Sequence, residues 1–255
     1  MPRKIRVEIS GYHHVYNRGV AKSNIFMDDF DREKFLTILS DVCKEYKFNV
    51  HSFCLMGNHY HLLLENLKEN LSDGMRQINS MYATYFNKRH KRVGHLWQGR
   101  FKSCFILDEN YLFTLFKYIE LNPVKAKLCD RIGQYKYCAT YSILKDGVPP
   151  YLSNSFVLRD YLLDDLIDLL NIPLDKNEKE NIEKLHKIKY KSLDGETIPI
   201  KKIELSEFFI DLKDKEKRNV AIYEAYKNDY NKSEIARKLG LSVTGVSKII
   251  KKFKV

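Results

Sequence analysis

Two histidines separated by a single residue are the clearest chemical feature of the sequence. They lie in the segment His59-Tyr-His61-Leu-Leu-Leu-Glu65, which we expect to be a strand. Alternate side chains of a strand face the same way, so the two imidazoles would lie about 6–7 Å apart on one face. A single histidine there would more often be an ordinary polar residue. The pair favours ligands that share one metal ion.

The metal expected at this pair is a catalytic one. Two histidines leave coordination positions open, and these can accept phosphate oxygens and water. With an oxygen-bearing third ligand, the sequence predicts Mg²⁺ or Mn²⁺ as the cofactor.

A tyrosine and an asparagine four residues apart form the second motif. Tyr118 and Asn122 would share a helix face if the helix continued. The Tyr118 phenol could act as a nucleophile once deprotonated, and the Asn122 carbonyl could be the third metal ligand. Alternatively, Tyr118 is a packing aromatic, and Asn122 with Pro123 starts a new short helix. Tyr111, seven residues earlier on nearly the same face, is the rival nucleophile.

Hydrophobic periodicity predicts the elements that must position these groups. The hairpin loop Gly57-Asn58 has two residues, with glycine in the first position as in a type II′ turn. The order is β-α-β-β-α-β-α, an α+β fold of the ferredoxin-like, split βαβ kind with one added helix. The strands are expected at residues 12–18, 48–56, 59–66 and 101–107, and the helices at 28–46, 71–87 and 108–121.

Composition limits the class of protein. The 255 residues are 44% hydrophobic, enough for a substantial core. No apolar run approaches the roughly 20 residues that span a bilayer, and the N-terminus lacks a signal-peptide pattern. We therefore expect a cytoplasmic protein without a membrane partner. The five cysteines form no C-x-x-C pair and are interpreted as reduced thiols.

The net charge of +11 indicates a polyanionic partner. Residues 74–107 contain no Asp or Glu, and aromatic residues alternate there with basic ones. This mixture suits single-stranded DNA with bases free to stack; the alternative is a solvated basic helix end. The candidate DNA-binding residues of this segment are Arg76, Lys88, Arg89, Lys91, Arg92, Trp97, Arg100 and Lys102.

The C-terminal residues predict a helix-turn-helix, with Gly240 at the turn. Residues 232–255 hold seven Lys or Arg and one Glu, which favours DNA binding over a generic helical pair. Thr244, Ser247 and Lys248 would face the DNA. The predicted domains are residues 1–145, a charged helical connector at 146–214, and the helix-turn-helix module at 215–255. Residues 156–170 read as one helix, and 175–191 as a surface helix or linker.

The motifs together resemble the HUH single-tyrosine transposases, especially their REP-associated branch. The resemblance covers residues 8–145 and rests on several motifs in order: His14 to Arg18 with Gly19, His59-Tyr60-His61, residues 96–102, and Tyr118-Ile-x-x-Asn122-Pro-Val-x-Ala. The sequence departs from the family pattern at Gly57, where proline is usual, and at Tyr60, where a small aliphatic residue is usual.

The resemblance implies a DNA transposase that cleaves and rejoins single-stranded DNA. Tyr118 would form a 5′-phosphotyrosine and leave a free 3′-OH, with the divalent metal held by His59, His61 and Asn122. Arg18 would contact DNA. Such enzymes recognise hairpins and are often homodimers, so a homodimer is expected, with a monomer as the alternative. Two other functions stay open: a non-catalytic DNA-binding regulator derived from such a transposase, and a metal-dependent nuclease that uses water.

Overall fold

The computed structural model describes residues 7–107, 109–187, 189–193, 196–200, 205–210, 214–227, 230 and 232–253. Contacts divide the chain into two compact units, residues 1–187 with 194–197, and residues 188–193 with 198–255. Residues 146–187 of the expected connector thus pack within the first unit. The three functional domains expected from the sequence stay a prediction.

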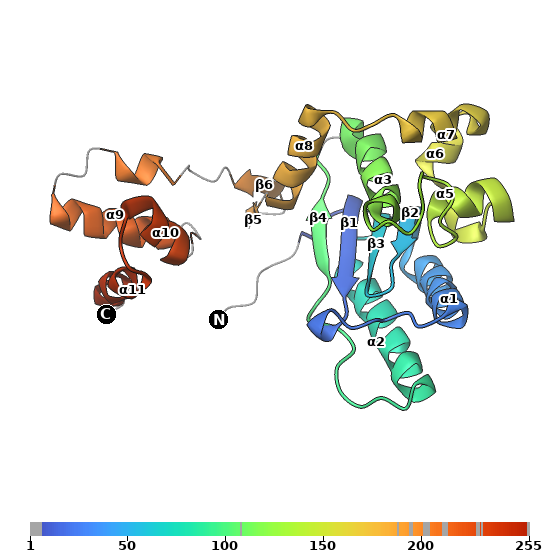
Figure 1. Ribbon diagram of the computed structural model, residues 1–255, viewed down its shortest axis with the longest axis horizontal. Coiled ribbons are helices and arrows are strands. Elements are labelled where there is room, and N and C mark those ends of the chain that lie inside the picture. The colour runs from blue at the N-terminus through green and yellow to red at the C-terminus, as the bar shows by residue number, and fades with distance from the viewer. Residues whose placement is uncertain are drawn as a thin grey trace. The chain divides into compact units, whose positions relative to one another are not determined.

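A four-stranded antiparallel sheet forms the centre of the first unit (Figure 1). Its strands are β1 (Gly11–Arg18), β2 (Phe48–Leu55), β3 (His59–Asn66) and β4 (Lys102–Phe105). They lie in the order β2-β3-β1-β4, so the histidine strand β3 is internal and pairs with β1 and β2. With the helices on both faces, this arrangement confirms the predicted α+β class.

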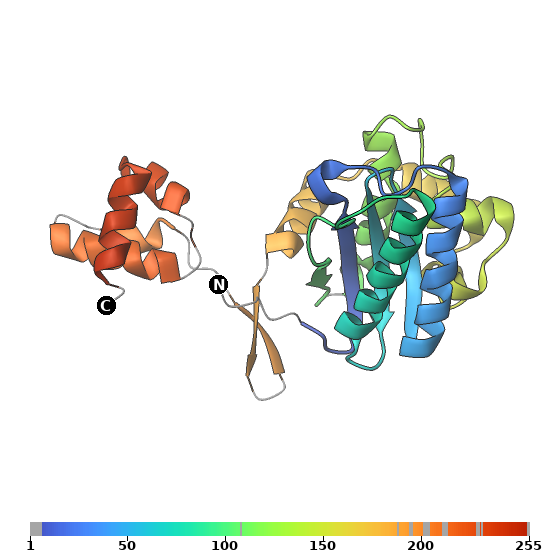
Figure 2. The ribbon, with the colours of Figure 1, turned by 90° about the horizontal axis from the view of Figure 1, so that it is seen from below.

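Helices α1 (Asp29–Tyr46) and α2 (Leu71–Arg89) lie side by side on one face of the sheet (Figure 2). The apolar side of β3 packs against them, and Tyr60 is fully buried. Its ring centre lies 4.9 Å from that of Phe35 and 5.7 Å from that of Trp97. Its hydroxyl donates a 3.1 Å hydrogen bond to Asn79 Oδ1. Even-numbered residues of β3 therefore belong to this core, and odd-numbered ones face away from it.

Helix α3 (Leu112–Glu120) contacts β2 and β3, with Leu115, Phe116 and Ile119 buried. It begins four residues later than predicted, and β4 is shorter than predicted. The single helix expected at 156–170 is two helices, because Tyr161 and Leu162 are extended. The remaining elements of this unit are η1 (Val20–Lys22), η2 (Glu109–Tyr111), α4 (Asn122–Lys125), α5 (Ala139–Tyr141), η3 (Ser142–Asp146), η4 (Pro150–Leu152), α6 (Phe156–Asp160), α7 (Leu163–Asn171) and α8 (Lys176–Lys187).

The hairpin between β2 and β3 has the predicted two-residue loop. The Met56 N–H donates to the His59 carbonyl at 2.9 Å. The predicted type II′ turn is wrong, because Gly57 does not have the positive φ that this turn needs at its first loop position. Contacts outside the hairpin hold the loop instead, since the N–H groups of Ile25 and Phe26 both donate to the Gly57 carbonyl.

The second unit contains a two-stranded sheet and a three-helix cluster. The cluster core consists of Ile222, Ala225, Ile235, Ala236, Val246 and Ile250. Gly240 has a φ of 65° and lets the chain turn between α10 and α11. The strands β5 and β6 fall within the expected connector and were not predicted. The elements are β5 (Lys189–Leu193), β6 (Glu196–Ile200), η5 (Glu207–Phe209), α9 (Lys215–Lys227), α10 (Lys232–Leu239) and α11 (Val243–Lys252).

Among the helices that the structure describes, none has the length and apolar character needed to cross a membrane. All five cysteines are free thiols, as predicted, and Cys43, Cys54 and Cys138 are buried.

Candidate active site

Strand register places the predicted chemical groups on the sheet face that α3 covers. Tyr16 of β1 is the register partner of His61, and Arg18 is the partner of His59. Partners in an antiparallel pair point to the same face. The side chains of these four residues therefore lie together, opposite the core of α1 and α2.

His61 is nearly buried and contacts a histidine of the neighbouring strand. Its Nδ1 lies 2.9 Å from Nε2 of His14, which is 1% exposed. The two rings are stacked, with centres 5.1 Å apart and an interplanar angle of 22°. Because His61 Nδ1 faces His14, a metal would be bound through the other ring nitrogen, Nε2.

His59 lies half-buried beside His61, with ring centres 5.2 Å apart. Its Nδ1 lies 2.6 Å from the Asn58 side-chain oxygen. Burial, and after it the positive charge of Arg18, lowers the pKa of His59 to about 4. The imidazole is therefore neutral at pH 7, which is the form that binds metal ions.

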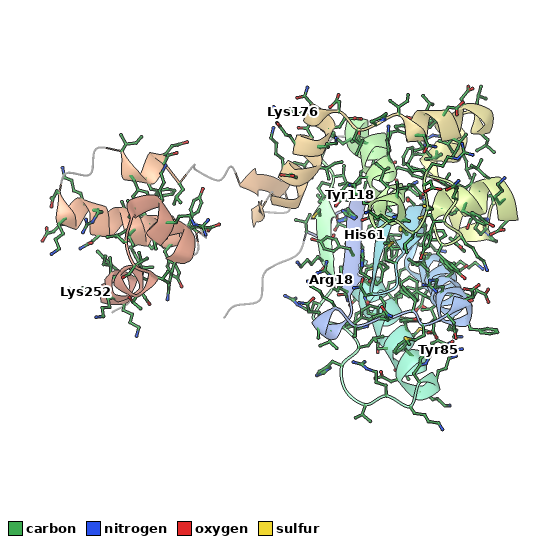
Figure 3. The ribbon with its side chains drawn as sticks, viewed as in Figure 1. Arg18, His61, Tyr85, Tyr118, Lys176 and Lys252 are labelled. Carbon is green, nitrogen blue, oxygen red and sulfur yellow. The ribbon has the colours of Figure 1, made fainter. Side chains whose placement is uncertain are left out.

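Tyr118 reaches the same cluster from α3 and is half-buried (Figure 3). Its ring stands edge-on to His14, with centres 6.2 Å apart. The Lys125 Nζ lies 4.5 Å from its ring centre. Burial, and after it Cys104 and Glu183, raises the pKa of the Tyr118 phenol. The phenol is thus neutral at pH 7 and needs a nearby positive charge or a base to become a nucleophile.

The Asn122 side chain supports the helix on which Tyr118 lies. The backbone stays helical at Leu121 and runs on into α4, so Asn122–Pro123 interrupts the helix less than predicted. Pro123 has no N–H to donate to the Ile119 carbonyl four residues earlier. The Asn122 Nδ2 donates to that carbonyl at 3.0 Å and to the Tyr118 carbonyl at 3.1 Å. With Nδ2 turned toward α3, Oδ1 lies on the other side of the amide carbon.

Of the three expected metal ligands, only His59 and His61 are side chains of the types that most often bind metal ions in proteins. In the described part of the chain, no group of three His, Cys, Asp or Glu side chains could hold a metal ion. The neutral His59 imidazole and the His61 imidazole fit a divalent cation, and an amide oxygen is a suitable third donor. A complete site on this face therefore depends on a ligand such as Asn122.

Three of the predicted DNA-binding residues lie on or next to strands β1 and β4, which border the cluster. Arg18 is exposed beside His59. Lys102 on β4 is exposed, and its Nζ lies 5.6 Å from the centre of the Tyr16 ring. Arg100, just before β4, is also exposed. These cations lie near the site, where a phosphate backbone would need them.

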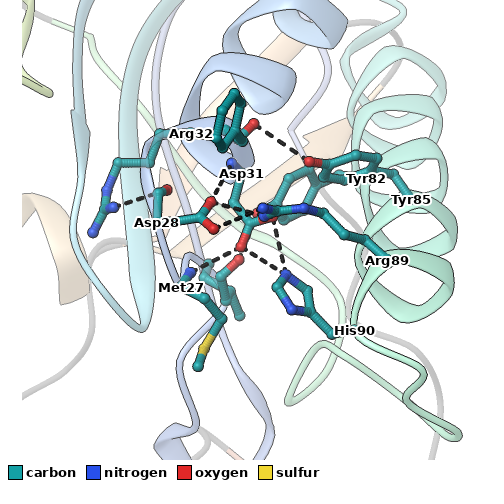
Figure 4. A network of polar contacts seen from close by, with 10 residues as sticks. Met27, Asp28, Asp31, Arg32, Tyr82, Tyr85, Arg89 and His90 are labelled. Carbon is teal, nitrogen blue, oxygen red and sulfur yellow. Dashed lines mark hydrogen bonds and ion pairs between the residues drawn. The ribbon is translucent and has the colours of Figure 1, made fainter.

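The predicted DNA-binding residues of α2 lie on the other face of the sheet. Arg76 pairs with Asp73 at 2.8 Å, and Lys88 is exposed. Arg89 forms ion pairs with Asp28 and Asp31, which join α2 to the start of α1 (Figure 4). The Arg89 charge is thus already compensated inside the protein.

Residues 91–97 form a connection between α2 and β4. Lys91 is exposed, and Arg92 donates a 3.0 Å hydrogen bond to the His95 carbonyl. The Trp97 ring packs against Tyr60, and its Nε1 donates to the Asn79 carbonyl at 2.9 Å. Trp97 is therefore mainly part of the core and offers little free surface for base stacking.

The three C-terminal candidates all lie on α11. Thr244 and Lys248 are exposed. Ser247 Oγ accepts a 3.1 Å hydrogen bond from Lys232 of α10, which ties the two helices together. Apolar side chains of α10 and α11 form the core there: Ile235, Val246 and Ile250 are buried, and Leu239 and Ile249 pack against them.

Three residues of the cluster were not singled out from the sequence. His14 and Tyr16 come from β1, and Lys125 comes from α4. The alternation of β1 places His14 and Tyr16 on one face, but the sequence does not reveal which residues of β3 they meet. Only the register supplies that information.

Part of the chain matches a known protein family. Residues 9–122 match the IS200-like transposase family. The matched segment begins just before β1 and ends at Asn122, so it contains both histidines of the pair and Tyr118. The family resemblance predicted from the sequence is confirmed.

Individual relatives of this IS200-like segment are distant. A protein of Haemophilus influenzae named as a REP-associated tyrosine transposase is 25% identical over 141 residues, which cover 51% of this chain and 79% of that protein. The solved structure of a REP-associated tyrosine transposase bound to a REP hairpin is 17% identical, with a TM-score of 0.48, over 59% of this chain and 90% of that one. A transposase structure from Deinococcus radiodurans is 15% identical, with a TM-score of 0.34, over 47% and 96% of the two chains.

Proposed function

We propose that this protein is a single-tyrosine transposase of the HUH type, which cleaves and rejoins single-stranded DNA. One observation carries the proposal. Residues 61 and 118, far apart in the sequence, both contact the buried ring of His14 on one face of the sheet. The match to the IS200-like transposases covers the same residues.

In the proposed reaction, the Tyr118 hydroxyl oxygen attacks a phosphorus atom of the DNA backbone. The new bond joins the Tyr118 oxygen to the 5′-phosphate, and the broken P–O bond releases the 3′-oxygen. The phenol gives up its proton in this step, and the 3′-oxygen takes one up. A 3′-hydroxyl later attacks the phosphotyrosine and restores a DNA strand and the free phenol. Lys125, with its Nζ 4.5 Å from the ring centre, supplies a positive charge where negative charge develops.

His59, His61 and Asn122 would hold the divalent metal, Mg²⁺ or Mn²⁺. When bound, the ion polarises the scissile phosphate and so favours attack. The neutral His59 imidazole and the fixed orientation of His61 prepare two of the three ligands. The Asn122 amide keeps its nitrogen on α3 and leaves its oxygen as the donor.

DNA recognition is assigned to two regions. Arg18, Arg100 and Lys102 would bind the strand beside the site, and the helix-turn-helix formed by α10 and α11 would bind duplex flanks or a hairpin stem. We further propose that the sheet order β2-β3-β1-β4 represents the ferredoxin-like fold, and that the protein acts as a homodimer in the cytoplasm.

The decisive test is a covalent-adduct assay. The protein is incubated with end-labelled, hairpin-containing single-stranded DNA and Mn²⁺, and the products are separated on a denaturing gel. The wild type should give a protein–DNA adduct, and Tyr118→Phe should give none, because the attacking oxygen is absent.

Two other tyrosines serve as matched controls. Tyr111, the rival candidate for the nucleophile, lies directly before α3. Tyr16 has its ring centre 5.6 Å from that of His61. Tyr111→Phe and Tyr16→Phe should both keep the adduct. Cleavage without an adduct would instead favour a nuclease that uses water, and binding without cleavage would favour a DNA-binding regulator.

A further inference from the structure

His14 lies behind the candidate metal ligand His61 and is almost completely enclosed. It is 1% exposed and lies on β1, where its neighbours across the sheet are Leu63 of β3 and Cys104 of β4. A buried imidazole in the middle of a sheet is costly unless its polar atoms have partners. Its Nε2 has one in Nδ1 of His61, at 2.9 Å.

This contact determines how the His61 ring is oriented. One proton lies between the two nitrogens, so one ring donates and the other accepts. If His61 donates from Nδ1, its Nε2 carries the lone pair that a metal requires. A hydrogen bond to the second nitrogen is how proteins commonly fix both the tautomer and the rotation of a ligating histidine.

We propose that His14 is a positioning residue that holds His61 in the Nδ1–H tautomer, with Nε2 presented to the metal. The proposal rests on the function proposed above, because it assumes that His61 is a ligand. It adds a role for a residue of strand β1 that is almost completely buried and acts through its contact with His61.

The surroundings of His14 explain why an imidazole suits this position. Tyr16 lies on one side, with ring centres 5.3 Å apart, and Tyr118 meets the ring edge-on at 6.2 Å. The same ring therefore touches the proposed nucleophile and the proposed ligand. Its flat shape fills the space between them, while Nε2 supplies the polar contact to His61.

Side-chain length provides a sharp test. Glutamine can place an amide oxygen close to the position of Nε2 and accept from His61, whereas asparagine is too short and phenylalanine has no polar atom. The variants are His14→Gln, His14→Asn and His14→Phe. His13→Gln is the control, because His13 is equally buried but hydrogen-bonds to Ser103 and the Ile9 carbonyl on the other face.

Two measurements on the full-length protein follow the effect. Nitrogen-15 NMR of labelled histidine reports the His61 tautomer without metal, and Mn²⁺ titration followed by electron paramagnetic resonance reports affinity. We expect one His61 tautomer in the wild type, His14→Gln and His13→Gln. We expect mixed tautomers and about 10–100-fold weaker Mn²⁺ binding in His14→Asn and His14→Phe. Circular dichroism checks that each variant is folded.

The outcomes separate the two proposals. A folded His14→Asn that keeps the wild-type His61 tautomer and Mn²⁺ affinity would overturn the positioning role. If the wild type binds no Mn²⁺ and forms no DNA adduct, the proposed function fails. A tautomer change in His14→Asn and its rescue in His14→Gln would still establish the role of His14 toward His61.

Discussion

Glu120 is a carboxylic acid buried beneath α3, two residues after the proposed nucleophile. It is 2% exposed, and its oxygens accept hydrogen bonds from the Ser52 hydroxyl and the Thr140 N–H. Burial raises the pKa of Glu120 to about 7, despite these hydrogen bonds, which lower it. The group therefore titrates near neutral pH in the folded protein and near 4.5 in the unfolded chain.

The sign of the pH effect follows from this difference. Between about pH 4.5 and 7, the folded state holds a proton on Glu120 that the unfolded state has lost, so stability falls as pH rises. From pH 5 to 8, the wild type should lose about 2.5 kcal/mol of unfolding free energy relative to Glu120→Gln. Urea unfolding followed by Trp97 fluorescence measures this, because Trp97 is the chain's single tryptophan and lies in the first unit.

Three histidines have the opposite effect on the pH dependence of stability in the lower part of this pH range. The pKa values of His13, His51 and His59 are lowered to about 4, mainly by burial. Their contribution to the unfolding free energy is lost as pH falls from 6.5 toward 4. Both proteins contain them, so they cancel in the difference. A wild-type minus Glu120→Gln difference that stays constant from pH 5 to 8 would contradict the prediction.

The site residues could be predicted where the argument needed only local spacing. His59 and His61 are two apart on a strand, and Tyr118 and Asn122 are four apart on a helix. His14 and Lys125 could not be assigned, because their roles depend on the β1–β3 register and on the helix continuing through Pro123. Arg89 and Trp97 fit the pattern of a DNA-binding segment, and the sequence does not reveal that both also make internal contacts.

At the scale of elements, a buried carboxylate joins the start of α1 to the end of α2. Asp31 has no exposed side-chain surface and accepts hydrogen bonds from the Met27 N–H, Arg89 and His90. Asp28 caps α1 and also pairs with Arg89 (Figure 4). The two helices that cover the core are thereby held together at one end.

Removing this carboxylate should destabilise the first unit strongly. We expect Asp31→Ala to lower the unfolding free energy by about 3–5 kcal/mol, because Arg89 and His90 lose a buried partner. Asp73→Ala is the matched control. It breaks the exposed pair with Arg76 and should cost less than about 1 kcal/mol. Equal urea midpoints for the two variants, measured by Trp97 fluorescence, would show that the network contributes little.

Hydrophobic periodicity predicts most of the helices and strands. The helices at 28–46 and 71–87 and the strand at 59–66 agree with α1, α2 and β3 to within about two residues. The local sequence does not predict the turn type at Gly57, because hydrogen bonds from Ile25 and Phe26 determine it. The hairpin β5–β6 was missed, because a strongly charged segment gives no clear apolar alternation.

At the scale of the whole molecule, the chain combines two compact units with different chemistry. The first contains the candidate active site, and the second contains α9, α10 and α11 around a small core. In α11, Lys248 is exposed, while Val246 and Ile250 face that core. Such a helix can present basic side chains to DNA while its apolar side stays packed.

Salt dependence of binding tests this role. A lysine that contacts one phosphate contributes about 0.9 to the slope of log affinity against log salt concentration. Lys248→Ala should therefore weaken binding to a hairpin-containing oligonucleotide and reduce the slope by about 1. Lys227→Ala, on α9 and paired with Glu224, should leave the slope unchanged. Fluorescence anisotropy at several salt concentrations measures both, and identical slopes for the two variants would rule out a phosphate contact by Lys248.

Tyr60 has a consequence for how this protein can be altered by evolution or by design. Its ring fills the space between Phe35 and Trp97. Its hydroxyl and the side-chain amide of Asn17 on β1 both donate hydrogen bonds to Asn79 Oδ1. A small aliphatic residue at position 60 would leave that volume empty. Such a substitution alone would therefore weaken the packing of the first unit. We expect residues 60 and 97 to be coupled, so that a change at one alters the effect of a change at the other.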